Sequence, residues 1–448
     1  MPGAEPPGSG RSPGHAKIAA ARFLIRARWL VPVEPAGAVL EQHAVAVRDG
    51  RIEKILPASQ AAARFADYER VDLPDHVLMP GLINAHTHAA LSLLRGLKEH
   101  AWPAQPPQLS PQFVRDGTAL ACAEMLRGGI TCFNDMYFFP EAALEAALAA
   151  GMRAALGLIV VDFPTAYASD PADYLRKGLA LRDRHREQPL ASFCLAPHAP
   201  YTVSDPTFRQ VATLAAELDI PVHLHVHETE DEIERSIAEH GVRPLERLGR
   251  LGLLGPGLIA VHAVHVDDAE IQLLARHGCS VAHCPSSNLK LASGFAPVEA
   301  MRNAQVNLCL GTDGAASNNR LDLFSEMRTA ALLAKAVARN AEAMPAHAVL
   351  RAATLGGARA LGLGERVGSI EPGKAADLVA VALRAPELAP CYDPVSHLVY
   401  AAGREHVTHV WVAGELRVRE GDLQNSAFSA LDTRWELWQN ALKSHADS

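Results

Sequence analysis

The stretch Pro80-Gly81-Leu82-Ile83-Asn84-Ala85-His86-Thr87-His88 is a short apolar run that leads into two histidines. In a β-strand, residues i and i+2 point to the same face, so His86 and His88 can converge on one metal ion. A bare His-x-His pair is equally compatible with two core or solvated histidines. Three further polar signals, each at the end of an apolar run, favour the metal site.

The second signal is the stretch Val222–Thr229, which reads VHLHVHET. Its three histidines alternate along one strand face, and His225 falls at the strand end as a candidate ligand. Glu228 opens the following loop, close enough to a ligand to serve as a general acid or base. We interpret His223 as packing beneath the site, and His227 as a neighbour of the site or a surface group.

The third and fourth signals are also strand ends. Ile259–His265 is an apolar run that reaches His262, and Leu308–Gly314 is an apolar run that reaches Asp313 between two glycines. Imidazoles together with one carboxylate suit Zn²⁺ or another divalent transition ion. Such an ion lowers the pKa of a bound water from ~15.7 towards ~7, which provides hydroxide at neutral pH.

The four signals belong to a regular alternation of apolar strand candidates and helical stretches. This alternation predicts an α/β fold, a (β/α)8 TIM barrel, with the candidate ligands at the strand ends where such barrels carry their chemistry. A doubly wound open sheet is the structural alternative. The predicted strands are Leu82–Ala85, Thr131–Asp135, Ala154–Val161, Ser192–Ala196, Val222–Val226, Leu258–Val264, Ser280–His283 and Val306–Gly311.

Short β runs and turns lie on both sides of this alternation, including the hairpin signal Asp49-Gly50. We therefore predict that residues 18–79 and 366–448 pair into one small composite β-sandwich domain, and that residues 80–365 form the barrel. Residues 1–17, which are rich in Pro, Gly, Ser and Ala, are predicted to be a disordered tail.

Composition narrows the class of protein. The chain has 448 residues and a net charge of −8, from charges of both signs spread along its length. It has no basic patch with interleaved aromatics and no apolar run near the ~20 residues of a membrane span, so neither nucleic acid nor a membrane is an expected partner. Seven cysteines without a Cys-x-x-Cys pair indicate small core residues of a cytoplasmic protein.

With these motifs, the chain resembles the amidohydrolase superfamily, in its branch of metal-dependent nucleobase and nucleoside deaminases and chlorohydrolases. Within that branch it is most similar to the 5-methylthioadenosine/S-adenosylhomocysteine deaminases. The stretches that carry the resemblance are Pro80–Leu94, Ala123–Pro140, Ala196–Thr202, Val222–Thr229, His283–Val298, Gly311–Asn318 and Gly368–Val379.

The resemblance implies one Zn²⁺ per subunit, or Fe²⁺ or another divalent ion in its place, bound by His86, His88, His225 and Asp313. It implies that Glu228 shuttles protons to the ring nitrogen and the leaving amine of the bound substrate, while Asp313 takes the remaining hydroxyl proton. His262 would orient the attacking water or stabilise the tetrahedral intermediate. His198 and Arg153 would contact the substrate.

The implied reaction is hydrolysis of the 6-amino group of an adenosine-type nucleoside to an inosine-type product and ammonia. The candidate substrates are 5'-methylthioadenosine, S-adenosylhomocysteine, 5'-deoxyadenosine and adenosine, and we expect a homo-oligomer. Binuclear members of the superfamily bridge two metals with a modified lysine after the fourth strand. Here that strand, Ser192–Pro197, runs directly into His198, which favours a mononuclear site.

The chain departs from the family pattern just after the first strand. The loop after Gly96 is about ten residues shorter, and the family's Trp-Pro-x-Glu reads Trp102-Pro103-Ala104-Gln105. Gln105 thus stands where a glutamate is expected to bind the ribose hydroxyls, and a neutral amide lacks the charge-assisted strength of a carboxylate.

Two alternatives remain open at this point. One is a deaminase or chlorohydrolase that acts on a free nucleobase or an s-triazine-like ring. The other is a protein of a different class, a non-catalytic scaffold with the same fold. Such a scaffold is expected to have lost its metal ligands, whereas the candidate ligands are all present in this chain.

Overall fold

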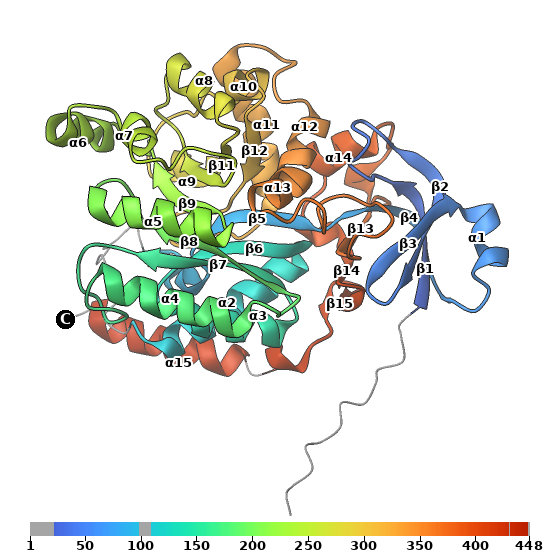
Figure 1. Ribbon diagram of the computed structural model, residues 1–448. Helices are drawn as coiled ribbons and strands as arrows, with labels where there is room; N and C mark the ends of the chain where they lie inside the picture. The colour runs from blue at the N-terminus through green and yellow to red at the C-terminus, as the bar shows by residue number, and fades with distance from the viewer. Residues whose placement is uncertain (1–21, 98–108, 430, 447–448) are drawn as a thin grey trace, which may run out of the picture.

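The computed structural model describes residues 22–97, 109–429 and 431–446, and two eight-stranded sheets organise them (Figure 1). The predicted tail, residues 1–17, and Gln105 lie outside the described residues. The two sheets meet where β4 (Glu69–Pro80) runs almost directly into β5 (Leu82–Thr87).

The larger unit is a parallel sheet whose neighbours follow the order of the chain from β5 to β12. The amide of Asp313, just after β12, donates to the carbonyl of His86 on β5 over 3.0 Å, so the sheet curls round until its ends nearly meet. The barrel prediction is therefore confirmed, and the open-sheet alternative is wrong. After β5 the strands are β6 (Ile130–Met136), β7 (Arg153–Val160), β8 (Ala191–Pro197), β9 (Val222–Val226), β10 (Leu258–His262), β11 (Ser280–His283) and β12 (Asn307–Leu310).

Helices cover the outside of the barrel, and its strands are buried almost throughout, as a parallel sheet between layers requires. Many of these helices begin with Pro at the first turn, and five have a Ser, Thr or Asp side chain that accepts a backbone N–H at the N-cap. They are α2 (Pro111–Arg127), α3 (Pro140–Ala150), α4 (Pro171–His185), α5 (Asp205–Leu218), α6 (Glu230–His240), α7 (Pro244–Arg250), α8 (Asp268–Arg276), α9 (Pro285–Lys290), α10 (Val298–Asn303), α11 (Leu323–Ala338), α12 (Ala346–Arg351) and α13 (Gly357–Ala360).

The segment that follows the two histidines is held tightly against α2. It forms a short 3-10 helix, η1 (Ala89–Leu94), and a Cβ at Gly117 of α2 would lie 2.2 Å from the carbonyl oxygen of Ala90. Only glycine allows this close approach. The backbone just after His88 is therefore packed directly on a helix.

The second sheet combines both chain ends in the order β16-β15-β14-β13-β4-β1-β2-β3. The junction is the antiparallel pair β4 and β13, in which Pro80 lies opposite Leu378. The ends of the chain thus share one sheet, as expected, whereas the exact domain boundaries stay predictions. The remaining elements of this part are β1 (Arg22–Leu30), β2 (Leu40–Arg48), β3 (Arg51–Pro57), α1 (Ala58–Arg64), β13 (Leu378–Ala382), α14 (Pro394–Tyr400), β14 (Val407–Val412), β15 (Glu415–Arg419) and β16 (Asp422–Leu423).

The C-terminal helix α15 (Leu431–Ala446) returns to the barrel and lies along its outside (Figure 1). The ring of Trp438 meets Phe113 of α2 edge to face at 5.4 Å, and its Nε1–H donates to Asp116 over 2.9 Å. The last part of the described chain is thus attached to the helix that supports η1.

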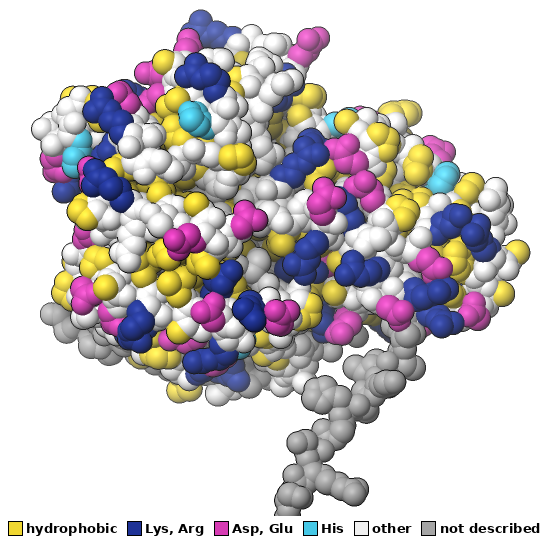
Figure 2. Space-filling model, viewed as in Figure 1, with side chains coloured by type: hydrophobic (Ala, Val, Ile, Leu, Met, Phe, Trp, Pro, Cys, Tyr) yellow, Lys and Arg dark blue, Asp and Glu magenta, His cyan; other side chains and the backbone are white. Residues whose placement is uncertain are grey.

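The mixed surface charge and the burial of the cysteines agree with the expectations from the composition. Figure 2 shows Lys and Arg side chains interspersed with Asp and Glu across the face it presents. All seven cysteines are free, and all but Cys391 are buried. Within the described ranges, the helices include none that is both long and apolar enough to cross a membrane.

Candidate active site

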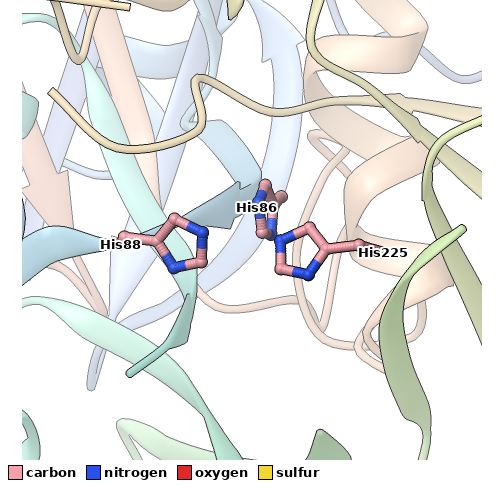
Figure 3. Close-up of side chains that lie close together, drawn as sticks. All are labelled: His86, His88 and His225. Carbon is pink, nitrogen blue, oxygen red and sulfur yellow. The ribbon is translucent and has the colours of Figure 1, made fainter. Parts of the chain in front are cut away.

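Three histidines from two strands meet at the carboxyl end of the barrel. His86 and His88 come from the end of β5 and His225 from β9, and Figure 3 shows their rings facing one another. Their potential ligand atoms all lie within 4.8 Å of one another. His86, His262 and Asp313 form a second such group that shares His86 with the first. The structure therefore brings together all four predicted ligands and His262.

The outer ring nitrogens of these histidines are held by neighbouring groups. Nδ1–H of His88 donates to the carbonyl of Met136 over 2.5 Å, and Nδ1–H of His225 donates to the carbonyl of His198 over 2.7 Å. Because a carbonyl can only accept, both protons are on Nδ1 and both Nε2 lone pairs are free. This is the usual arrangement of imidazoles that bind a metal through Nε2.

The ring of His86 has one nitrogen without a hydrogen-bond partner in the described part of the chain, at the point where the three rings meet. Nδ1 of His86 lies 3.0 Å from Nε2 of His223, which packs behind it as expected. Nε2 of His86 is buried and has no hydrogen-bond partner among the described residues. A buried polar atom without a partner is costly, and a cation at this point would satisfy it. Three imidazole nitrogens and a carboxylate fit a divalent transition ion such as zinc.

Asp313 is held rigidly beside these rings. Its backbone has a φ of 58° in the left-handed region, and its Oδ1 lies 3.5 Å from His86 Nε2 and 3.4 Å from His88 Nε2. Oδ1 also accepts the N–H of Gly314 over 2.7 Å, and Oδ2 accepts the hydroxyl of Ser287 over 2.6 Å. Burial alone would raise the pKa of Asp313, but the neighbouring imidazoles of His86, His88 and His262 bring it well below its usual value. The carboxylate is therefore ionised and ready to bind a cation.

Burial also sets the charge of the imidazoles. It lowers the pKa of His86 and His198 to about 4, and it lowers the pKa of His223 and His225 well below the usual 6.5. These rings are neutral at pH 7, which is the state in which imidazole can bind a metal or accept a hydrogen bond.

The candidate acid–base pair lies next to the candidate metal ligands. Glu228 follows β9, and its Oε2 is 3.8 Å from Nε2 of His262 at the end of β10. Nδ1–H of His262 donates to Oδ1 of Asn288 over 2.8 Å, and its Nε2 points toward Glu228. The backbone of His262 has a φ of 71°, so the chain turns sharply at this position.

These groups open into one cavity of about 450 Å³. His198 lines this cavity, so the structure places this predicted contact residue at the pocket. A hydrogen bond of 3.0 Å joins its Nδ1 to the hydroxyl of Thr202. The cavity is polar at the candidate metal ligands and largely apolar elsewhere. Its apolar wall comprises Leu91, Met136, Tyr137, Phe138, Ile159, Val161, Phe163 and Leu291.

Two expectations need correction. Arg153 lies at the start of β7, at the opposite end of that strand from the pocket, where its guanidinium binds Asp377 of the second sheet over 2.9 and 3.0 Å. It is a buried link between the sheets rather than a substrate contact. His227 is not a surface group, because it is fully buried and its Nε2 accepts the N–H of Leu245 over 3.1 Å.

Three residues without an expected role support the site. Ser287 contacts Asp313, and Asn288 contacts His262. Both lie in the stretch His283–Val298, where a Ser-Asn pair after a strand could have indicated such a supporting role. Glu232 binds backbone amides next to Glu228. Its signal was the spacing Thr229-Glu230-Asp231-Glu232, which is typical of a helix N-terminus.

The model of the amidohydrolase family matches residues 77–417, more than half of the chain. The chain belongs to the amidohydrolase family. Among its relatives, a protein of Saccharophagus degradans is 48% identical over 94% of this amidohydrolase and 96% of its own length, and one of Teredinibacter turnerae is 46% identical over 94% and 97%. Both are named 5-methylthioadenosine/S-adenosylhomocysteine deaminase.

Solved structures show the same fold. A structure described as an adenosine deaminase of Xanthomonas campestris with bound zinc superposes with a TM-score of 0.92 at 51% identity, over 95% of this amidohydrolase and 99% of that chain. An atrazine chlorohydrolase of Arthrobacter aurescens superposes with a TM-score of 0.86 at 23% identity, over 93% and 99%. The second likeness concerns the fold alone.

Proposed function

We propose that this amidohydrolase is a zinc-dependent deaminase that hydrolyses the 6-amino group of an adenosine-type nucleoside. The product would be an inosine-type nucleoside plus ammonia, with 5'-methylthioadenosine, S-adenosylhomocysteine, 5'-deoxyadenosine and adenosine as candidate substrates. The observation that carries the proposal is the convergence of the predicted ligands on the unpartnered Nε2 of His86, directly beside Glu228. Relatives at 46–48% identity with the deaminase name support it.

We assign the metal to His86, His88, His225 and Asp313. When bound, the ion supplies Lewis acidity and makes water a nucleophile at neutral pH. Glu228 would take a proton from the attacking water and deliver it to the ring nitrogen beside the amino-bearing carbon. Once the remaining hydroxyl proton has passed from Asp313 to Glu228, Glu228 would protonate the leaving amine. His262, whose Nε2 faces Glu228, would orient the water, and the ionised Asp313 would accept the last hydroxyl proton.

The shape of the pocket bears on the substrate. Its described lining includes neither lysine nor arginine, and its charged members are Glu228 and Asp313. An apolar wall with aromatic side chains suits a purine ring and an uncharged 5' group. A 5'-phosphate would bring negative charge next to two carboxylates, so a nucleoside is a better ligand than the corresponding nucleotide.

The test compares the wild-type protein with a Glu228→Gln variant. Because the amide cannot carry the proton, we expect ammonia release to fall by roughly 10²–10⁴-fold while the zinc content stays the same. Glu230→Gln, at an exposed position at the start of α6, is the matched control. Near-normal turnover by Glu228→Gln would contradict the proposed role.

The substrate class is tested with the same assay. The zinc-loaded protein is offered the four nucleosides, adenosine 5'-monophosphate, free purines and s-triazines, and ammonia or chloride release is measured. We expect turnover of at least one nucleoside and little of the monophosphate. Activity only on free bases or triazines would replace the nucleoside proposal, and inactivity with bound zinc would support a non-catalytic role.

A further inference from the structure

Glu232, on the first turn of α6, binds two consecutive peptide groups of the loop that carries Glu228. Its Oε1 accepts the N–H of His227 over 3.0 Å, and its Oε2 accepts the N–H of Glu228 over 2.9 Å. Both oxygens of one carboxylate are thus used to hold the backbone of the proposed proton shuttle. The catalytic scheme above makes no use of this residue.

The contact differs from an ordinary helix cap. In a capping box, the acidic side chain at the third helical position returns to the N–H of the N-cap residue. The same protein provides an example in α8, where Glu270 accepts the N–H of its N-cap residue Asp267 over 3.1 Å. In α6 the hydroxyl of Thr229 caps the N–H of Glu232 over 3.3 Å, but the carboxylate passes the N-cap residue and reaches one and two residues farther back. The Glu232 carboxylate therefore holds the loop that carries Glu228 and does not cap α6.

Burial of the Glu232 carboxylate is unfavourable in free energy. Glu232 is only 4% exposed, and burial raises its pKa to about 7. A charged group in such a position destabilises a protein unless it is bound by donors. The donors here are the two amides at the point where the chain adopts a left-handed φ of 57° at His227. This turn directs the following side chain, Glu228, toward the cavity.

We propose that Glu232 is a positioning residue for the deamination, an inference that rests on the proposed role of Glu228. Its carboxylate fixes the peptide between His227 and Glu228 and so holds the proton-shuttling carboxylate at one place in the pocket. Misplacement of a reacting group by about 1 Å can cost about 10²-fold in rate, so a backbone clamp of this kind acts mainly on the chemical step.

Glu232→Gln is the sharpest variant, because it keeps the shape of the side chain and changes only its hydrogen bonding. An amide offers one acceptor and one donor group, so one of the two peptide N–H groups would face an N–H. Glu234→Gln, an exposed position on the same helix, is the matched control. The measurements are kcat and KM on the adenosine analogue that is deaminated fastest, zinc content, and hydrogen–deuterium exchange of the peptide 222–229.

We expect Glu232→Gln to lower kcat by roughly 10–100-fold, with KM changed less than about threefold and with the wild-type zinc content. The amides of peptide 222–229 should exchange faster in Glu232→Gln than in Glu234→Gln. If Glu232→Gln does not fold, Glu232→Asp gives the same test, because its shorter side chain cannot reach both amides.

Wild-type kcat or wild-type exchange in the folded variant would overturn the inference, and so would loss of zinc, which would indicate general disruption. The outcome is separable from that of the proposed function. If Glu228→Gln is inactive and Glu232→Gln is fully active, only the positioning role fails. If Glu228→Gln itself is active, the proposed function of the site fails as well.

Discussion

The hydroxyl of Ser287 donates a 2.6 Å hydrogen bond to Oδ2 of Asp313, and this bond joins α9 to the loop after β12 at the candidate metal centre. The other carboxylate oxygen faces the Nε2 atoms of His86 and His88. Ser287 therefore fixes the rotation of the carboxylate and determines which oxygen is offered to an ion. Neighbours that orient a metal ligand in this way contribute measurably to metal affinity.

We expect Ser287→Ala to weaken zinc binding by about 10–100-fold, because the carboxylate of Asp313 would lose its partner on Oδ2. Competition with a chromogenic chelator measures this affinity. Ser293→Ala is the matched control, since Ser293 is also buried but its hydroxyl has no hydrogen-bond partner among the described residues. Equal zinc affinity of the two variants would contradict the orienting role of Ser287.

Arg153→Met tests the reassignment of Arg153 from the pocket to the junction between the sheets. Removal of the guanidinium leaves the carboxylate of Asp377 buried without its partner, so we expect a loss of about 3–5 kcal/mol in the free energy of unfolding. Urea denaturation measures the loss. KM should stay within about twofold of the wild-type value, whereas a large rise in KM at unchanged stability would restore the role in substrate contact.

The buried ionisable groups predict how stability depends on pH. Burial lowers the pKa of eight histidines below the usual 6.5, so the unfolded chain takes up their protons first and stability is lost as the pH falls from 6.5 toward about 4. These are His76, His86, His198, His223, His225, His227, His283 and His409.

Buried carboxyls with a raised pKa act in the opposite sense, because the folded chain takes up their protons first. They are Asp135, Glu141, Glu232, Asp322 and Glu326, with values of about 6 for Asp135 and about 7 for Glu232 and Glu326. The histidines are more numerous, so we expect the metal-free protein to be less stable at pH 5 than at pH 7. Urea unfolding at both values measures this, and equal or greater stability at pH 5 would refute it.

The barrel and the cluster of candidate metal ligands were predictable from the sequence. Both follow from local patterns, since each predicted strand is an apolar run and each candidate ligand stands at the end of one. In a parallel barrel all strand carboxyl ends lie on the same rim, so His86, His225 and Asp313 had to be near one another whatever the details of packing.

The side chains that surround these groups could not be predicted from local patterns, because they come from elements that meet only in the folded chain. Arg153 and Asp377 are 224 residues apart, and their contact depends on how the chain ends dock beneath the barrel. Asn288 of α9 likewise meets His262 at the end of β10. Glu232 has a helix-start spacing in the sequence, but its carboxylate binds the amides before the cap because the chain makes a left-handed turn at His227. Such contacts depend on the direction of the backbone between elements, which no local spacing encodes.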